Sequence, residues 1–597
     1  MNGSPIEPRA TTSASLAGGR GRVFRPPWWV RAKRGEFTWW IRPEWQDPLI
    51  GPDGLKLSEW RDRGRLATVK QGPHRIVYRA DLPEGSVYVK HYLVPDARAM
   101  LRQWFRRGKG RNEGRRAANL EAIGVPTITP IALGEQRRGK FLFENYLITA
   151  AIVDTLPLDE FVERLLPKYS QARAARIRRS LAVALGVLTA KLHDAGFLHT
   201  DFHPGNILVR IDADDTPMLS MIDLDALRVH RYVSWNDARA NLALLNHYFW
   251  MRSELTDRHR FLSAYFEARG QQPPEGHSFA RGIELSTRRW AERLWTRWGR
   301  RCRGSNKYFA AQHAPGAWGI RVRGMKTALM AALIADPDAP FQDPATTIIK
   351  QSRTTTVAEL TMEIGGAPRQ VIYKRFNRKK WLDPLLALFR PSRGWRAWQA
   401  GQHLSSRGLP TPQNLAFIAR LGKHAPWWPA SWLPRDTYVV TVKAEPSVTL
   451  GDYVRQNLAT MEPSARRERI TALAASLALL VRSLHERSVS HRDLKAANIL
   501  IEGDPTSPHP SLSVIDLVGV QLARPVPRAR RIQNLARLYL SLEDCPGRTR
   551  TDLLRFLKRY NAGALLPPED WKGLWRSTAI AAENKRRQNQ QRGRRLS

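Results

Sequence analysis

Hydrophobic and polar residues alternate in two segments far apart in the chain, GSVYVKHY at 85–92 and RQVIYKRF at 369–376. Both are rich in β-branched and aromatic residues, so the alternation predicts β-strands, each with a central lysine, Lys90 or Lys374. Further strand-like runs follow in each half, at 141–149 and 437–443. The chain therefore carries two sets of strands in the same order.

A helical pattern repeats in the same way. Basic, helix-prone stretches at 115–127 and 396–411 end in GVPT and GLPT, which indicate a helix stop followed by a proline turn. In each half a long helix with apolar periodicity is then predicted to lead into a polar loop. The most apolar part of the helix in the second half, ITALAASLALLV at 470–481, is shorter than the roughly 20 residues that span a bilayer. We expect it to be a buried helix.

The polar loops themselves share a pattern. Residues 199–208 read HTDFHPGNIL and residues 491–500 read HRDLKAANIL, with histidine, aspartate and asparagine at the same spacing. Each loop is followed by an apolar run that ends in an aspartate, Asp223 or Asp516, and then by a helix that starts around RANLALL or IQNLARL. The matched spacing predicts that a whole domain has been duplicated. We expect His199 and His491 to brace the loop rather than to transfer protons.

This order of residues suits the transfer of a phosphoryl group from a metal-bound nucleotide to a hydroxyl. A strand lysine holds the phosphates, a helix acid orients that lysine, a loop aspartate accepts the hydroxyl proton, and an asparagine and a second aspartate hold Mg²⁺. In the first half these residues are Lys90, Glu113, Asp201, Asn206 and Asp223. In the second half they are Lys374, Asp493, Asn498 and Asp516, with Lys495 as a further phosphate-binding candidate and Ala397 where the helix acid is expected.

The HxDxHPGN loop, the following IDxD and the GxPT turn resemble the Kdo/WaaP-type lipopolysaccharide kinases, within the protein-kinase-like superfamily. The resemblance covers most of residues 60–250 and, more loosely, 345–540. It implies an α+β fold of two tandem bilobal domains, each with a small β-rich N-lobe and a larger helical C-lobe. It also implies ATP and Mg²⁺ as cofactors, and a sugar of the lipopolysaccharide inner core as the phosphate acceptor.

The chain departs from the kinase pattern in two places. Neither half has a complete GxGxxG loop: the first has KQGPHRIVYRA with the single Gly72, and the second has KQSRTTTVAEL with no glycine. The absence of an acid at Ala397 is the larger departure, because Lys374 then lacks the residue expected to orient it. We expect an active first domain at 55–285, and a second domain at 286–580 whose activity is open and whose role could be regulatory.

Two other functions fit part of the pattern. A serine/threonine protein kinase is favoured by HRDLKAAN with Lys495, but no Ala-Pro-Glu segment follows either metal-binding aspartate, so a platform for a peptide substrate is missing. A non-catalytic, membrane-associated pseudokinase scaffold is opposed by the complete residue set of the first half. Nucleic-acid binding ranks last, since no zinc-finger or RRM signature is present.

The net charge and the composition of the chain indicate which partners it could bind and where it is located. The net charge of +42 favours an anionic glycolipid, sugar or membrane surface, although an arginine-rich composition alone could produce it. We interpret Cys302 and Cys545 as free thiols in the cytoplasm. Residues 1–54 are predicted to form a partly disordered extension, whose Trp- and Arg-rich segment at 24–45 either binds the cytoplasmic face of the inner membrane or packs on the first domain. Residues 581–597 are predicted to be a basic, disordered tail.

Overall fold

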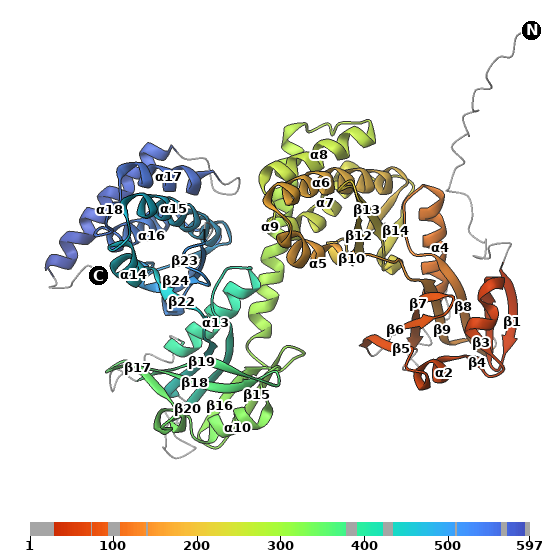
Figure 1. Ribbon diagram of the computed structural model, residues 1–597, viewed down its shortest axis with the longest axis horizontal. Helices are drawn as coiled ribbons and strands as arrows, with labels where there is room; N and C mark the ends of the chain where they lie inside the picture. The colour runs from red at the N-terminus through yellow and green to blue at the C-terminus, as the bar shows by residue number, and fades with distance from the viewer. Residues whose placement is uncertain are drawn as a thin grey trace, which may run out of the picture. The chain divides into compact units, whose positions relative to one another are not determined.

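The computed structural model describes residues 29–72, 75–93, 108–138, 141–377, 391–421, 434–507, 510–562 and 570–591. The chain divides into two compact units, of which the first ends at Trp290 and the second begins at Ala291 (Figure 1). This division and the predicted boundary at 285 both fall within one helix, α9 (His277–Arg301).

The first unit begins with a seven-stranded sheet in the order β1-β2-β8-β9-β7-β6-β5. Its strands are β1 (Val30–Arg34), β2 (Phe37–Ile41), β5 (Leu66–Gly72), β6 (Arg75–Leu82), β7 (Gly85–Leu93), β8 (Pro130–Arg138) and β9 (Phe141–Ala150). Short elements connect β2 to β5, namely α1 (Gln46–Leu49), β3 (Ile50–Gly51), β4 (Gly54–Leu55) and α2 (Leu57–Asp62). The helix α4 (Lys109–Ala122) packs on this sheet and also contacts the turn after Asp223 in the helical lobe (Figure 1).

A helical lobe completes the first unit. Its helices are α5 (Leu158–Glu160), α6 (Gln171–Asp194), α7 (Trp235–Phe249) and α8 (Leu255–Arg269), followed by α9. Two small sheets lie among them, one built from β10 (Leu156–Pro157), β12 (Ile207–Ile211) and β13 (Pro217–Met221), and one from β11 (Phe197–His199) and β14 (Leu227–Val229). The polar loop lies between β11 and β12, so these two short strands fix its ends.

The second unit repeats the large sheet of the first unit. Its large sheet has the order β15-β16-β20-β21-β19-β18-β17, which matches the first sheet position by position. The strands are β15 (Phe309–Ala314), β16 (Ala317–Val322), β17 (Thr347–Ser352), β18 (Thr355–Ile364), β19 (Ala367–Phe376), β20 (Asn414–Leu421) and β21 (Pro434–Val442). The helices described beside this sheet are α10 (Thr327–Ala335), α11 (Ala339–Gln342) and α13 (Arg393–Ser406).

The second helical lobe has the same small sheets around its polar loop. They contain β22 (Ser447–Thr449), β24 (Ile499–Glu502) and β25 (Ser511–Val514) in one sheet, and β23 (Val489–His491) and β26 (Val520–Leu522) in the other. The helices are α14 (Leu450–Tyr453), α15 (Pro463–Glu486), α16 (Arg528–Ser541), α17 (Arg550–Asn561) and α18 (Trp571–Gln591). The predicted buried helix at 470–481 is confirmed, because α15 buries Ile470, Leu473 and Leu477 in the lobe core.

The hairpin β1–β2 corrects the predicted N-terminal extension. Strand β2 pairs with β8 along its whole length, so residues 30–41 belong to the first sheet. The side chains explain this: Trp39 and Ile41 are fully buried, and Trp39 stacks on Tyr146 of β9. The second unit has an equivalent hairpin, β15–β16, whose strand β16 pairs with β20. Trp28 lies outside the described residues.

The C-terminal end of the chain is also more ordered than its composition predicts. Helix α18 continues through residues 581–591 of the predicted tail, and Ala582 is buried against Ala536 and Leu540 of α16. The burial of one apolar face of α18 against α16 therefore stabilises this segment as a helix despite its many basic residues. Among the residues that the structure describes, no helix has the length and apolar composition needed to cross a membrane.

Candidate active sites

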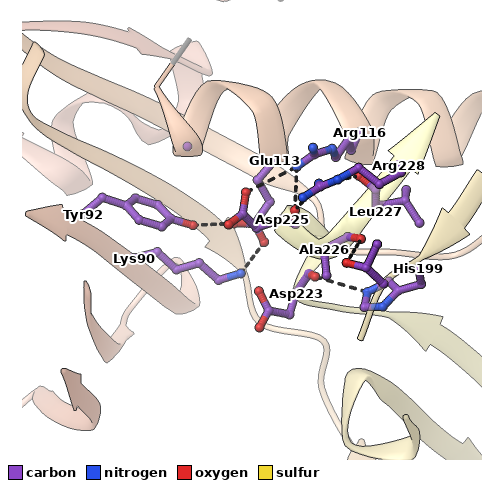
Figure 2. Close-up of polar contacts among 12 residues, drawn as sticks. Lys90, Tyr92, Glu113, Arg116, His199, Asp223, Asp225, Ala226, Leu227 and Arg228 are labelled. Atoms are coloured by element: carbon purple, nitrogen blue, oxygen red, sulfur yellow. Dashed lines mark hydrogen bonds and ion pairs between the residues drawn. The ribbon is translucent and has the colours of Figure 1, made fainter. Parts of the chain in front are cut away.

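In the first unit a fully buried carboxylate anchors the strand lysine. Lys90 on β7 forms an ion pair with Glu113 Oε1 on α4, and the Tyr92 hydroxyl donates to Glu113 Oε2 at 2.6 Å (Figure 2). Glu113 has no exposed surface, and a buried charge of this kind is tolerated when it is paired and hydrogen-bonded. Burial, and then the charge of Glu113, raise the pKa of Tyr92 well above its ordinary value, so Tyr92 remains a hydrogen-bond donor.

The polar loop presents Asp201 to solvent. The Asp201 side chain is 72% exposed, and the Asn206 amide nitrogen donates to the Asp201 backbone carbonyl at 2.9 Å. His203 Nε2 lies 3.5 Å from Asp201 Oδ2, while His203 Nδ1 accepts the Gly205 N–H. These contacts fix the shape of the loop and leave the Asp201 carboxylate accessible to an incoming hydroxyl.

Asp223 follows β13 in a left-handed conformation, with φ of 53°, which costs an L-residue about 1 kcal/mol. Its Oδ1 accepts from Arg75 at 3.3 Å. His199 Nε2 contacts its backbone carbonyl at 3.3 Å (Figure 2). Burial alone would raise the pKa of Asp223, but the charges of Arg75 and Lys90 outweigh it and lower that pKa. Burial lowers the pKa of His199, which favours a neutral ring in the bracing role predicted from the sequence.

A further ion pair joins α4 to the turn after Asp223. Arg116 lies 3.4 Å from Asp225 Oδ1 and donates to the Asp225 backbone carbonyl at 3.1 Å, and Arg228 donates to the same carbonyl at 3.0 Å (Figure 2). Glu113 and Arg116 lie one helical turn apart, so one face of α4 contacts both the strand lysine and the turn after Asp223. The helix thereby couples two parts of the site that come from different lobes.

A buried network supports each polar loop. In the first unit His193 contacts the Tyr265 hydroxyl at 2.8 Å and Asn241 Oδ1 at 3.1 Å, and Asn241 Nδ2 donates to the His199 carbonyl at 2.7 Å. In the second unit the same contacts join His485, Tyr560, Asn534 and the His491 carbonyl, at 2.7, 3.1 and 3.1 Å. The matched positions of Asn241 and Asn534 in the sequence thus have a structural cause.

The second unit keeps the polar loop and the left-handed turn that follows the small sheet. Asn498 Nδ2 donates to the Asp493 carbonyl at 2.8 Å and to its Oδ2 at 3.2 Å, and Lys495 Nζ lies 3.8 Å from Asp493 Oδ2. Asp516, like Asp223, is left-handed, with φ of 56°. The candidate residues of the second loop therefore lie together as the sequence predicts.

The strand lysine of the second unit has a different partner. Lys374 Nζ donates to Asp516 Oδ1 at 3.1 Å, because α13 carries Ala397 where α4 carries Glu113. Phe376 stands two residues after Lys374, where the first unit has Tyr92, so the hydroxyl and the carboxylate are absent together. Burial alone would raise the pKa of Asp516, but the charge of Lys374 lowers it, with smaller contributions from His491 and Arg393.

The residues of the first site suit a magnesium ion and a nucleotide. Mg²⁺ prefers oxygen ligands, and Asp223 supplies a carboxylate next to Asn206 in the loop. The Asn206 amide nitrogen is bonded to the loop backbone, so its oxygen is the atom that would bind a cation. Lys90, whose side chain is 12% exposed, would then contact phosphate oxygens.

Sequence reasoning missed three residues of the first site, Tyr92, Arg75 and Arg116. Two of them had a signal: Tyr92 lies two residues after Lys90 on the same face of a strand, and Arg116 lies one turn after Glu113 on a helix. Arg75 reaches Asp223 because it pairs with Tyr92 across β6 and β7. That pairing depends on a hairpin register that the sequence did not specify.

The fold and the two loops define a tandem protein with two kinase-like domains. The sequence profile of the lipopolysaccharide kinase (Kdo/WaaP) family matches residues 75–265 and 350–560, which together make up more than half of the chain. The chain therefore belongs to this family of lipopolysaccharide kinases, and both parts of the tandem arrangement are matched.

The solved structures that are similar to this chain include the following two. "WaaP in complex with acyl carrier protein" has 21% identity and a TM-score of 0.30, and the match covers 39% of this chain and 92% of that one. The Toxoplasma gondii specific rhoptry antigen kinase domain has 16% identity and a TM-score of 0.22, with 37% and 74% covered. No curated protein sequence matches the chain.

Proposed function

We propose that the first unit transfers the γ-phosphoryl group of ATP to a sugar hydroxyl of the lipopolysaccharide inner core. The observation that carries this proposal is the buried pairing of Lys90 with Glu113, at a site that also contains Asp223 and the Asn206-braced loop of Asp201. The family provides the acceptor class.

In this proposal each residue has a defined role. Lys90, held by Glu113, binds phosphate oxygens of ATP, and Asp201 accepts the proton of the attacking hydroxyl. Asn206 and Asp223 hold Mg²⁺, which neutralises charge on the phosphates when it is bound. His199 and Asn241 position the loop without touching the reactants.

The surroundings of the site favour a sugar over a peptide as acceptor. Only residues 224–234 separate Asp223 from α7, and β14 occupies part of that stretch. The second unit is equally short, since residues 517–527 separate Asp516 from α16. A protein kinase uses a longer segment here to hold its peptide.

The second unit is proposed to be a second or regulatory site. It retains Asp493, Asn498 and Asp516, and Lys495 lies beside Asp493 as in protein kinases. The net charge of the chain, +42, would attract the protein to an anionic glycolipid surface and keep it near its acceptor on the cytoplasmic face of the membrane. Trp39 and Trp40 are buried in the first sheet and cannot contribute to such contact.

The acceptor class can be tested with labelled ATP and Mg²⁺. The purified full chain is incubated with lipopolysaccharide core and, separately, with a generic protein substrate, and the products are separated. We expect label on the glycolipid. A double Asp201→Asn, Asp493→Asn variant is the matched control and should transfer none. Label on the protein substrate alone would overturn the proposal.

A further inference from the structure

Arg393, the first residue of α13, ties this helix to the hairpin between β17 and β18. Its NH1 donates to the Thr354 carbonyl at 3.0 Å, and its NH2 donates to the Thr355 hydroxyl at 3.4 Å. In the kinase fold, the hairpin at this place covers the phosphates of the nucleotide. The guanidinium therefore lies at the position where phosphate oxygens enter.

Lys374 and Arg393 converge on one aromatic ring. Lys374 Nζ lies 5.1 Å from the centre of the Phe376 ring, and the Arg393 guanidinium carbon lies 5.3 Å from the same centre. Lys374 also contacts Asp516. The absence of a hydroxyl on this ring and of a carboxylate at Ala397 thus leaves room for two cations near the metal-binding aspartate.

The charges of the two sites differ as a result. In the first unit Lys90 and Arg75 are balanced by Glu113 and Asp223. In the second unit, within the part of the chain that the structure describes, Lys374 pairs with Asp516 and Arg393 bonds to the hairpin, which leaves one excess positive charge among these residues. Such an excess attracts a polyphosphate in the way that a bound metal ion otherwise does.

The arginine is particular to the second unit. Helices α4 and α13 are both 14 residues long, and each is followed by a glycine with positive φ, Gly124 or Gly408. The residue of α4 that matches Arg393 is Lys109, whose side chain is exposed to solvent. A cation at the start of this helix is therefore turned into the site only in the second unit.

We propose that Arg393 and Lys374 form a nucleotide-phosphate site in the second unit that binds ATP without a divalent metal ion. A guanidinium has five donors, so its two bonds to the hairpin fix its position while others remain for phosphate oxygens. In the first unit, Lys90 held by Glu113 and a metal ion would together supply the positive charge and the fixed geometry. In the second unit Arg393 supplies both. This inference concerns binding by the second unit and does not depend on the acceptor proposed for the first.

The test measures ATP binding calorimetrically on the full chain, in Mg²⁺ and in EDTA. A background of Lys90→Met with Glu113→Gln removes both charges of the buried pair, so that the first unit contributes no nucleotide site and neither charge is left unpaired. We expect binding to persist in EDTA. Adding Arg393→Ala should weaken it about tenfold or more, as expected for loss of a charged hydrogen-bonding partner.

Two further variants complete the design. Arg393→Gln removes the charge but keeps an amide that can donate to the Thr354 carbonyl, and it should weaken binding about as much as Arg393→Ala while the thermal midpoint is unchanged. Lys109→Ala, at the matched position of α4, should leave binding as it is. The proposal is overturned if ATP binds only with Mg²⁺, or if both Arg393 variants bind ATP as tightly as the background chain.

Discussion

Two helices of equal length, α4 and α13, occupy the same place in the two units but differ at one position, which is Glu113 in α4 and Ala397 in α13. Glu113 is buried and receives Lys90 and Tyr92, whereas Ala397 leaves Lys374 to pair with Asp516. Around this difference both units share the asparagine brace of the loop, the left-handed aspartates and the buried histidine networks. The comparison shows that the scaffold of a kinase site can be kept while the charges that position the phosphates are rearranged.

The largest effect is expected from breaking the pair that only the first unit has. Glu113→Ala leaves Lys90 and the Tyr92 hydroxyl without their buried partner, and removal of one member of a buried pair costs about 4 kcal/mol. If that cost appears in the transition state, kcat/KM for glycolipid phosphorylation falls roughly a thousandfold.

The matched control for this variant is Glu135→Ala. Glu135 is another buried carboxylate of the same lobe, paired with Arg111 and Arg137 and not with Lys90. Its loss should lower the thermal midpoint with a much smaller change in kcat/KM. Equal kinetic losses in the two variants would show that Glu113 contributes stability and not lysine positioning.

Acid should affect both units alike, because both contain the buried histidine network. Burial lowers the pKa of His193 and of His485 to about 4, below the value of about 6.5 expected in the unfolded chain. The unfolded state therefore binds more protons, so this stability is present above about pH 6.5 and is lost as the pH falls towards 4.

For each histidine the free energy of unfolding falls by about 3 kcal/mol between pH 7 and pH values below 4. Urea unfolding at pH 7, 5.5 and 4.5 measures it. In His485→Gln the unfolding of the second unit should lose the part of its pH dependence that one proton contributes, while the first unit is unchanged. An identical slope in the variant would contradict the assignment.

A smaller, paired effect is expected from the asparagines of the same networks. Asn241→Ala and Asn534→Ala each leave a buried histidine nitrogen and a loop carbonyl without their partner, at a cost of about 2 kcal/mol. Differential scanning calorimetry should show each variant destabilising its own unit by a similar amount. A large difference between the two would mean that the networks are not equivalent.

The smallest effect is expected from building the missing pair into the second unit. Phe376→Tyr with Ala397→Glu places a hydroxyl and a carboxylate where the first unit has Tyr92 and Glu113. We expect Lys374 to exchange Asp516 for the new carboxylate, and transfer by the second unit to rise about tenfold, one factor of ten per 1.4 kcal/mol. An Asp201→Asn background removes transfer by the first unit, so that transfer by the second unit is measured alone. No rise in rate would mean that Arg393, and not the missing acid, limits transfer by the second unit.

Much of the site could be read from spacing, and the rest required tertiary pairing. The loop residues and the glycine–proline turns are local in sequence, so Asp201, Asn206 and Asp223 could be placed together from their order. The hairpin β1–β2 could not, because tryptophans among basic residues resemble a membrane-binding segment until the sheet that buries them is known. Arg75 and Arg393 depend on which hairpin lies over which helix, and that is set by register and packing.

The most direct measurement of the central claim compares two single substitutions in glycolipid phosphorylation under single-turnover conditions. Asp201→Asn removes the proposed base of the first unit and should reduce the rate about 10²- to 10⁴-fold, the usual contribution of a general base. Asp493→Asn, the same change in the second unit, should leave most of the rate. Loss of activity in Asp493→Asn with retention in Asp201→Asn would contradict the account.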